Sequence, residues 1–162
     1  MDESEQLALV DEEELVSLAR ELVRIDSVIR PETGNTEAGV VEFLRGWIRR
    51  ELGLEPTVQT VEPGRENLFF TLDSGRPGPC LLLEGHTDVV SEGERSRWSV
   101  DPFGGELKGG RLYGRGACDM KAGLAVNLVT AKALLRTRLP WKGRLRLCFV
   151  CDEEGMMIGI KH

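Results

Sequence analysis

The stretch that decides the fold is Leu81-Leu82-Leu83-Glu84-Gly85-His86-Thr87-Asp88, in which an apolar run ends in an imidazole and a carboxylate. The run starts at Cys80 and predicts a β-strand that is covered on both faces. At an extended strand end His86 and Asp88 share a face, because side chains two apart point the same way. Asp88 is therefore predicted to accept the second imidazole N–H, which fixes the tautomer and makes the ring a better metal donor. Taken alone, the pair is equally well explained as a histidine bonded to a nearby aspartate.

Two further segments carry carboxylates beside glycine. Gly114-Arg115-Gly116-Ala117-Cys118-Asp119 precedes a helical pattern, and Asp152-Glu153-Glu154-Gly155 follows a strand pattern. Imidazole and carboxylates together suit zinc and its neighbours among the divalent metals. Each segment has a simpler alternative, because Asp119 could be a plain helix N-cap and the glutamate pair a solvated acidic turn. A dinucleotide loop is excluded, since Asp119 stands where that fingerprint needs glycine.

Helical and strand patterns are interspersed along the chain, which predicts an α/β fold with a layered mixed sheet flanked by helices. The first ten residues are acidic and are predicted to be disordered. The predicted helices are 11–24, a second one capped by Thr36 and stopped by Gly53, and 121–137. The predicted strands are 57–61, 67–72, the apolar run at 80–83, and 144–151.

The bulk composition limits the classes of function. A chain of 162 residues with 41% hydrophobic and 30% charged residues has the balance of one soluble globular core. The net charge of -6 argues against a nucleic-acid partner. The sequence contains no apolar run long enough to span a bilayer and no basic signal peptide, so we predict a cytoplasmic protein with no membrane partner. Cys148 and Cys151 are predicted to be buried free thiols, since strand positions three apart face opposite ways and cannot clamp one ion.

In this order, the three segments resemble the di-zinc deacylase and exopeptidase family of acetylornithine deacetylase, succinyl-diaminopimelate desuccinylase, aminoacylase and glutamate carboxypeptidase. The resemblance implies that His86 and Glu154 each hold one of two zinc ions, with cobalt or manganese as possible substitutes. It implies that Asp119 bridges both ions and is followed by a cis peptide bond. Glu153 is implied to be the general base, beside Asp88 as a second catalytic residue. Ala122 and the pair Met156-Met157 depart from the commoner family residues without touching a ligand.

The resemblance also implies a reaction and a larger assembly. The reaction is hydrolysis of an amide bond in an N-acyl amino acid or a peptide, and the complete enzyme is implied to be a homodimer. The family supplies two more ligands later in the chain and an inserted lid domain. Residues 11–162 are therefore expected to be the N-terminal part of a zinc-exopeptidase-like catalytic domain, without its lid and dimerisation domain, and His162 is not expected to be a ligand. We expect weak metal binding, little activity and some self-association. The alternative is a non-catalytic metal-binding or assembly remnant.

Overall fold

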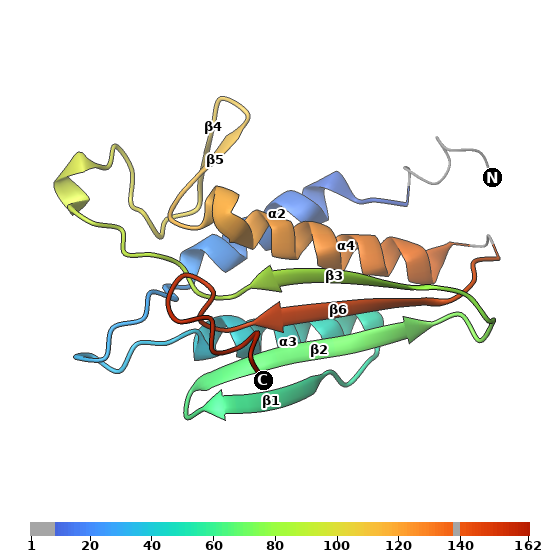
Figure 1. Cartoon of the computed structure of the whole chain (residues 1–162). Coiled ribbons are helices and arrows are strands. Elements are labelled where there is room, and N and C mark those ends of the chain that lie inside the picture. Colours follow the sequence, from blue (N-terminus) through green and yellow to red (C-terminus); the bar gives the residue numbers. More distant parts are fainter. Residues whose placement is uncertain (1–8, 138–139) are drawn as a thin grey trace.

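The structure is a computed structural model that describes residues 9–137 and 140–162. Most of the predicted disordered N-terminus, residues 1–8, lies outside the described residues. The central feature is a four-stranded sheet in the order β1-β2-β6-β3 (Figure 1). The strands are β1 (Thr57–Glu62), β2 (Arg65–Asp73), β3 (Cys80–His86) and β6 (Arg144–Val150). β6 pairs antiparallel with β2 and parallel with β3, so the sheet is mixed, as predicted.

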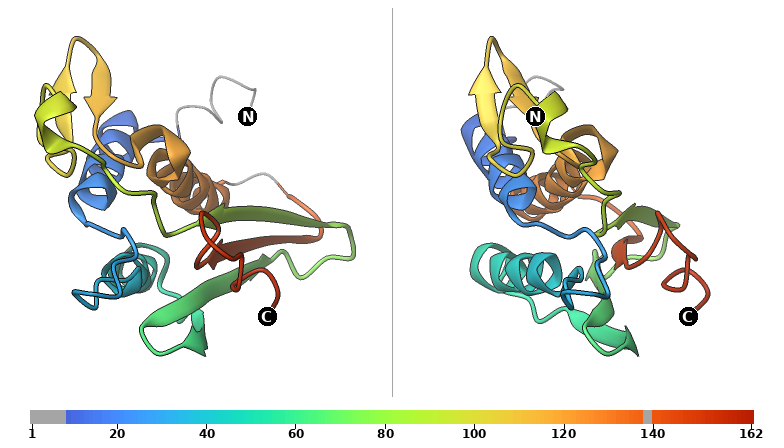
Figure 2. Two further views of the ribbon diagram at one scale, coloured as in Figure 1. Left: turned by 60° about the vertical axis from the view of Figure 1, so that its left-hand side comes forward. Right: turned by 90° about the vertical axis from the view of Figure 1, so that its left-hand side faces the viewer.

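The described helices lie on one side of this sheet, the second and third along the chain against the strands and the first against the third (Figure 2). They are α2 (Glu12–Arg24), α3 (Ala38–Leu52) and α4 (Ala122–Arg136). The strands present alternating side chains to the helices, and Leu68, Leu147 and Phe149 are wholly buried between the layers. This alternation places one apolar core between helices and sheet and confirms the layered α/β prediction.

The helix ends follow local capping chemistry. The Asp11 side chain accepts a hydrogen bond of 3.0 Å from the Glu14 amide at the start of α2. Thr36 was predicted to cap α3, but Glu37 holds the N-cap position, and the Thr36 hydroxyl lies 3.3 Å from the Ala38 amide nitrogen. Gly53 ends α3 with φ of 67°, a left-handed conformation that costs glycine little.

The prediction that the Cys80 strand is covered on both faces is wrong. β3 is an edge strand that pairs only with β6 among the described residues, and Leu81 and Leu82 are 59% and 54% exposed. Burial begins only at its carboxyl end, at Gly85 and His86. A continuous apolar run therefore marks an edge strand here.

The connection from β3 to β6 positions the carboxyl ends of both strands together. It contains η1 (Arg95–Arg97), the hairpin β4 (Glu106–Lys108) and β5 (Arg111–Tyr113), the irregular turn η2 (Ala117–Lys121), and then α4. Because β3 and β6 are parallel neighbours, the residues that follow each strand meet at one edge of the sheet. In the part of the chain that the structure describes, no helix is long and apolar enough to cross a bilayer.

The four cysteines form no disulfide. Cys151 is buried as predicted, whereas Cys148 is only half-buried because its side of β6 faces away from the helices.

Candidate metal centre

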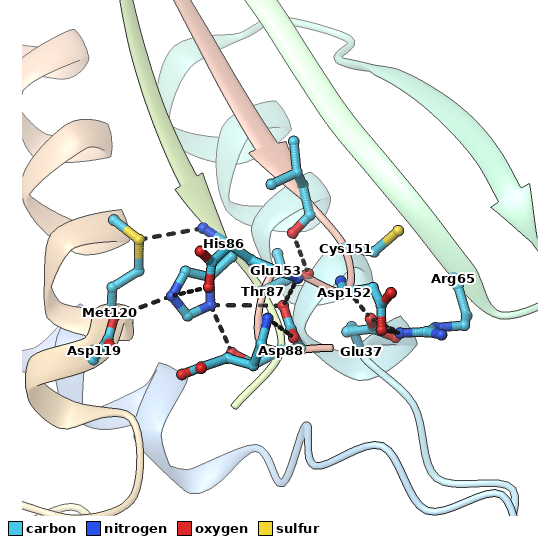
Figure 3. A network of polar contacts seen from close by, with 12 residues as sticks. Glu37, Arg65, His86, Thr87, Asp88, Asp119, Met120, Cys151, Asp152 and Glu153 are labelled. Carbon is cyan, nitrogen blue, oxygen red and sulfur yellow. Dashed lines mark hydrogen bonds and ion pairs between the residues drawn. The ribbon is translucent and has the colours of Figure 1, made fainter. Parts of the chain in front are cut away.

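The site lies where β3 and β6 end side by side (Figure 3). The backbone N–H and the hydroxyl of Thr87 both donate to the carbonyl oxygen of Val150, over 2.9 and 3.1 Å. These bonds continue the ladder one residue beyond β3. His86 and the 152–154 segment are thereby held at a fixed separation.

His86 lies at the centre of the cluster and is 5% exposed. Its Nε2 is 3.0 Å from Asp119 Oδ1 and 3.8 Å from Glu153 Oε2. Its Nδ1 is 2.9 Å from the backbone oxygen of Asp88 and 3.6 Å from the Asp88 carboxylate, so the carbonyl is the nearer acceptor. Burial lowers the pKa of His86, but contacts with Asp88 and Asp119 outweigh burial and raise it to about 9.

Asp88 joins the two strand ends. Its side chain is almost wholly buried, and its two carboxylate oxygens accept the amide hydrogens of Glu153 and Glu154 over 3.0 and 2.9 Å. Burial raises the pKa of Asp88, but His86 and these amides stabilise the charged form and lower the pKa overall. The Asp88 carboxylate therefore organises the acidic segment directly, a contact that sequence reasoning did not provide.

Asp119 reaches the imidazole from η2. Asp119 and Met120 have non-helical dihedral angles, and the peptide bond between them is cis, as the resemblance implies. Lys121 holds the N-cap position of α4, so the plain N-cap alternative does not describe Asp119. The Asp119 side chain is 74% exposed at the mouth of the site, with one oxygen toward His86.

Two glycines are required for this close packing. A Cβ atom at Gly85 would lie 2.6 Å from Leu124 Cδ2 and 2.8 Å from Met120 Cε. Gly116 has φ of 78°, and a Cβ there would lie 2.5 Å from Val89 Cγ1. Glycine at both positions lets η2 approach β3 closely enough for Asp119 to reach the ring.

Glu153 and Glu154 complete the acidic cluster. Donor atoms of His86, Glu153 and Glu154 all lie within 4.8 Å of one another. Burial raises the pKa of Glu154, and the charges of Asp119 and Glu153 add to the rise, partly offset by His86. Carboxylates crowded around one imidazole, beside a cleft of about 290 Å³, are a donor set that a divalent cation would stabilise. The chemistry of the site therefore fits a metal.

Sequence reasoning missed the charged residues beneath the site. Glu37 and Asp152 are buried, and Arg65 donates to both carboxylates over 2.9 and 2.6 Å. Asp152 directly precedes the acidic pair, and this position is the one feature of the local sequence that points to a role at the site. Glu37 and Arg65 belong to segments whose sequence shows only a helix pattern and a strand pattern, respectively.

Lys121 was also missed as a buried cation. It is wholly buried, and its Nζ donates to the backbone oxygen of Ile25 at the end of α2. Burial lowers its pKa to about 8, against the opposing influence of Asp26. The contact anchors the turn that carries Asp119.

The fold is an α/β domain, and its site gathers a histidine and carboxylates near the carboxyl ends of two parallel strands. These two features are typical of a metal-binding α/β domain. A family model for peptidase family M20/M25/M40 matches residues 82–162. The chain belongs to this family.

Curated relatives agree with the family assignment. The chain is 40% identical over 142 residues to a succinyl-diaminopimelate desuccinylase of Rhodospirillum centenum, covering 86% of the chain and 35% of the relative. It is 41% identical over 144 residues to the desuccinylase of a Methylobacterium species, with the same coverage of 86% and 35%. The chain thus spans about 35% of the length of these relatives.

Solved structures agree with the fold. An M20 family metallo-carboxypeptidase of Sulfolobus solfataricus superposes with a TM-score of 0.75 at 23% identity, over 89% of this chain and 31% of that one. Human carnosine dipeptidase 1 gives 0.71 at 22% identity, over 92% and 34%. A Bacillus subtilis protein with a TM-score of 0.56 at 17% identity, covering 94% of this chain and 37% of that one, is described as a dinuclear metal binding peptidase.

Proposed function

We propose that this chain supplies part of a two-metal centre that hydrolyses an amide bond. The observation that carries the proposal is the position of the His86 Nε2 atom, which lies 3.0 Å from Asp119 and 3.8 Å from Glu153 at the ends of two parallel strands. Several carboxylates around one buried imidazole repel one another, so such a cluster is unfavourable for stability alone and is typical of a functional site.

The proposed ligands divide between two metal positions. His86 and Asp119 would hold the first ion, and Glu154 with the same Asp119 would hold the second. A bridging role suits Asp119, because its exposed carboxylate can offer one oxygen to each side. Zinc is the proposed metal, since imidazole and carboxylate ligands suit it, and cobalt or manganese could replace it. A bound divalent ion would lower the pKa of its bound water to about 7 and polarise the substrate carbonyl.

Glu153 is the proposed general base. Its side chain is 36% exposed and lies beside the imidazole, so it can take a proton and return it to the leaving amine. Asp88 supports this role, because its carboxylate holds the Glu153 amide and its backbone oxygen faces the His86 ring.

The proposed substrate is an N-acyl amino acid or a peptide. Support comes from the relatives, which include succinyl-diaminopimelate desuccinylases and a metallo-carboxypeptidase. Because the chain spans about 35% of the length of its relatives, we propose that residues 11–162 are one part of a catalytic domain. That the complete enzyme is a homodimer stays a prediction. The cytoplasmic location stays a prediction.

Metal binding tests the assignment. Zinc titration by calorimetry should show that His86→Ala weakens binding by at least about tenfold, whereas Cys148→Ser should bind like the wild type. Equal affinity in wild type and His86→Ala would overturn the assignment of His86.

The division of roles requires the longer protein. There Glu153→Ala should keep both metals and lose turnover, whereas Glu154→Ala should also lose the second metal. Identical metal content in the two variants would contradict the division.

In the 162-residue chain each ion has only two of the proposed ligands, fewer than the three of an ordinary catalytic site, so binding should be weak and amidase activity minimal. Robust turnover by a mass-verified monomer would show that the essential ligands are misjudged.

A further inference from the structure

Three charged residues, of which Glu37 and Asp152 are buried and Arg65 is partly buried, form a cluster beside the acidic pair. Glu37 precedes α3, Arg65 begins β2, and Asp152 follows β6, so three separate parts of the chain meet there (Figure 3). The side chains are 0%, 14% and 7% exposed, respectively. Charges this deeply buried must be paired to be tolerated, so the geometry of the cluster is constrained.

Arg65 links the two carboxylates. Its Nη2 donates to Glu37 Oε1 over 2.9 Å and to Asp152 Oδ1 over 2.6 Å. Its Nε lies 3.3 Å from Glu37 Oε2, so the Glu37 contact is bidentate. Glu37 Oε1 also accepts the backbone N–H of Asp152 over 3.0 Å. Both the side chain and the backbone of Asp152 are thereby held.

Asp152 in turn shapes the segment that carries the acidic pair. It has φ of 61°, and its Oδ2 accepts the amides of Met156 and Ile158 over 2.9 and 3.3 Å. A Cβ atom at Gly155 would lie 2.5 Å from Asp152 Oδ1, so the turn wraps closely around this carboxylate. Glu153 and Glu154 directly follow Asp152 and precede Gly155, so they lie within this turn.

We propose that Glu37, Arg65 and Asp152 are a positioning unit that sets the direction in which Glu153 and Glu154 project from the end of β6. Asp88 holds the amides of the pair from the β3 side, and the positioning unit holds the preceding residue from the β2 and α3 side. The benefit for catalysis rests on the proposed function, whereas the ordering of the turn does not and can be measured without metal.

Hydrogen exchange read by NMR tests the ordering. Arg65→Lys keeps the positive charge and removes the planar fork that reaches both carboxylates. The amides of Glu153, Glu154 and Met156 should then exchange at least about tenfold faster, with those of α4 unchanged. Leu72→Ala is the control, because Leu72 lies on the same strand and faces the helices, outside the cluster. Leu72→Ala should lower overall stability without opening this turn selectively.

Zinc titration of the same variants separates this inference from the proposed function. Arg65→Lys should weaken zinc binding by at least about tenfold, and Leu72→Ala should not. Unchanged exchange in Arg65→Lys would overturn the positioning unit, and faster exchange with unchanged zinc affinity would overturn its role at the site. Faster exchange in Arg65→Lys, together with no zinc binding by the longer wild-type protein, would support the positioning unit and overturn the proposed function. If Arg65→Lys does not fold, Glu37→Gln provides the same comparison.

Discussion

The two ends of the parallel pair β3–β6 differ in burial and in hydrogen bonding. At the carboxyl end, Gly85, His86, Phe149 and Val150 are buried and are followed by residues tied together by hydrogen bonds. At the amino end, Leu81 and Leu82 of β3 are more than half exposed. Along β3, the chain therefore runs from an exposed, apolar amino end to a closely packed, polar carboxyl end.

The difference shows where order in this site comes from. A strand end can present a histidine at a defined position only if the residues around it resist displacement. Burial supplies that resistance for Phe149, and charge-assisted hydrogen bonds supply it for Asp88. Leu81 and Leu82 have neither kind of support, so these two positions should tolerate substitution.

Core truncation should give the largest contrast. Phe149→Ala removes a wholly buried ring and should lower the free energy of unfolding by about 4 kcal/mol. Leu81→Ala, at a position 59% exposed, should lower it by less than about 1 kcal/mol. Urea denaturation measures both values. Similar losses of unfolding free energy in the two variants would mean that Leu81 is packed in solution and that the two strand ends do not differ in burial.

Carboxylate replacement should give the next largest effect. In Asp88→Asn one of the two oxygens that accept amide hydrogens becomes an NH₂ group, so a partly buried N–H loses its partner at a cost of about 1–2 kcal/mol. The matched change Asp73→Asn lies at the opposite end of the sheet, at the exposed last residue of β2, where the Asp73 carboxylate accepts the Gly75 amide. It should change stability by less than about 0.5 kcal/mol. Equal effects in thermal unfolding would remove any special role for the Asp88 contacts.

Local patterns accounted for most of the fold. The capping residue Asp11, the stop at Gly53 and the alternating residues of β6 each act within a few positions, so the sequence displays them directly. The exposure of β3 depends on which strands flank it, a non-local property that an apolar run does not encode.

The site was predictable to the extent that its residues lie in compact motifs. The structure brings His86, Asp119 and Glu153 together as the three motifs suggested, although their catalytic roles stay predictions. Glu37 and Arg65 were missed because nothing in their own segments signals a contact with Asp152, and only the folded chain joins them.

Surface charge should affect association more than stability. Leu82 pairs with the exposed Arg146 on the sheet face opposite the helices, lines a shallow pocket with Arg146 and Phe69, and is 54% exposed. Leu82→Lys should leave the free energy of unfolding within about 0.5 kcal/mol and reduce self-association in sedimentation velocity. Val126→Lys adds the same charge at a site on α4 that is 49% exposed. If both variants reduce association equally, net charge rather than this face is responsible.

Thiol labelling compares the two strand ends without any substitution. Cys80 is exposed at the amino end of β3, whereas Cys151 directly follows β6 and is 0% exposed. Burial, with a smaller contribution from the charge of Glu37, raises the pKa of Cys151 to about 11. Because the thiolate is the reactive form, only about one Cys151 in a thousand would be reactive near pH 8, even if reagent could reach it.

Iodoacetamide followed by peptide mass spectrometry should therefore modify Cys80 readily and Cys151 hardly at all in the native protein. A raised pKa means that the thiolate fraction grows with pH, so residual Cys151 labelling should increase about tenfold per pH unit while the fold persists. Labelling in urea is the control, since both cysteines should react at similar rates once the chain is unfolded. Rapid labelling of Cys151 in the native protein would mean that the carboxyl end of β6 unfolds locally. The strand end beside the candidate metal centre would then be no more ordered than the exposed amino end of β3.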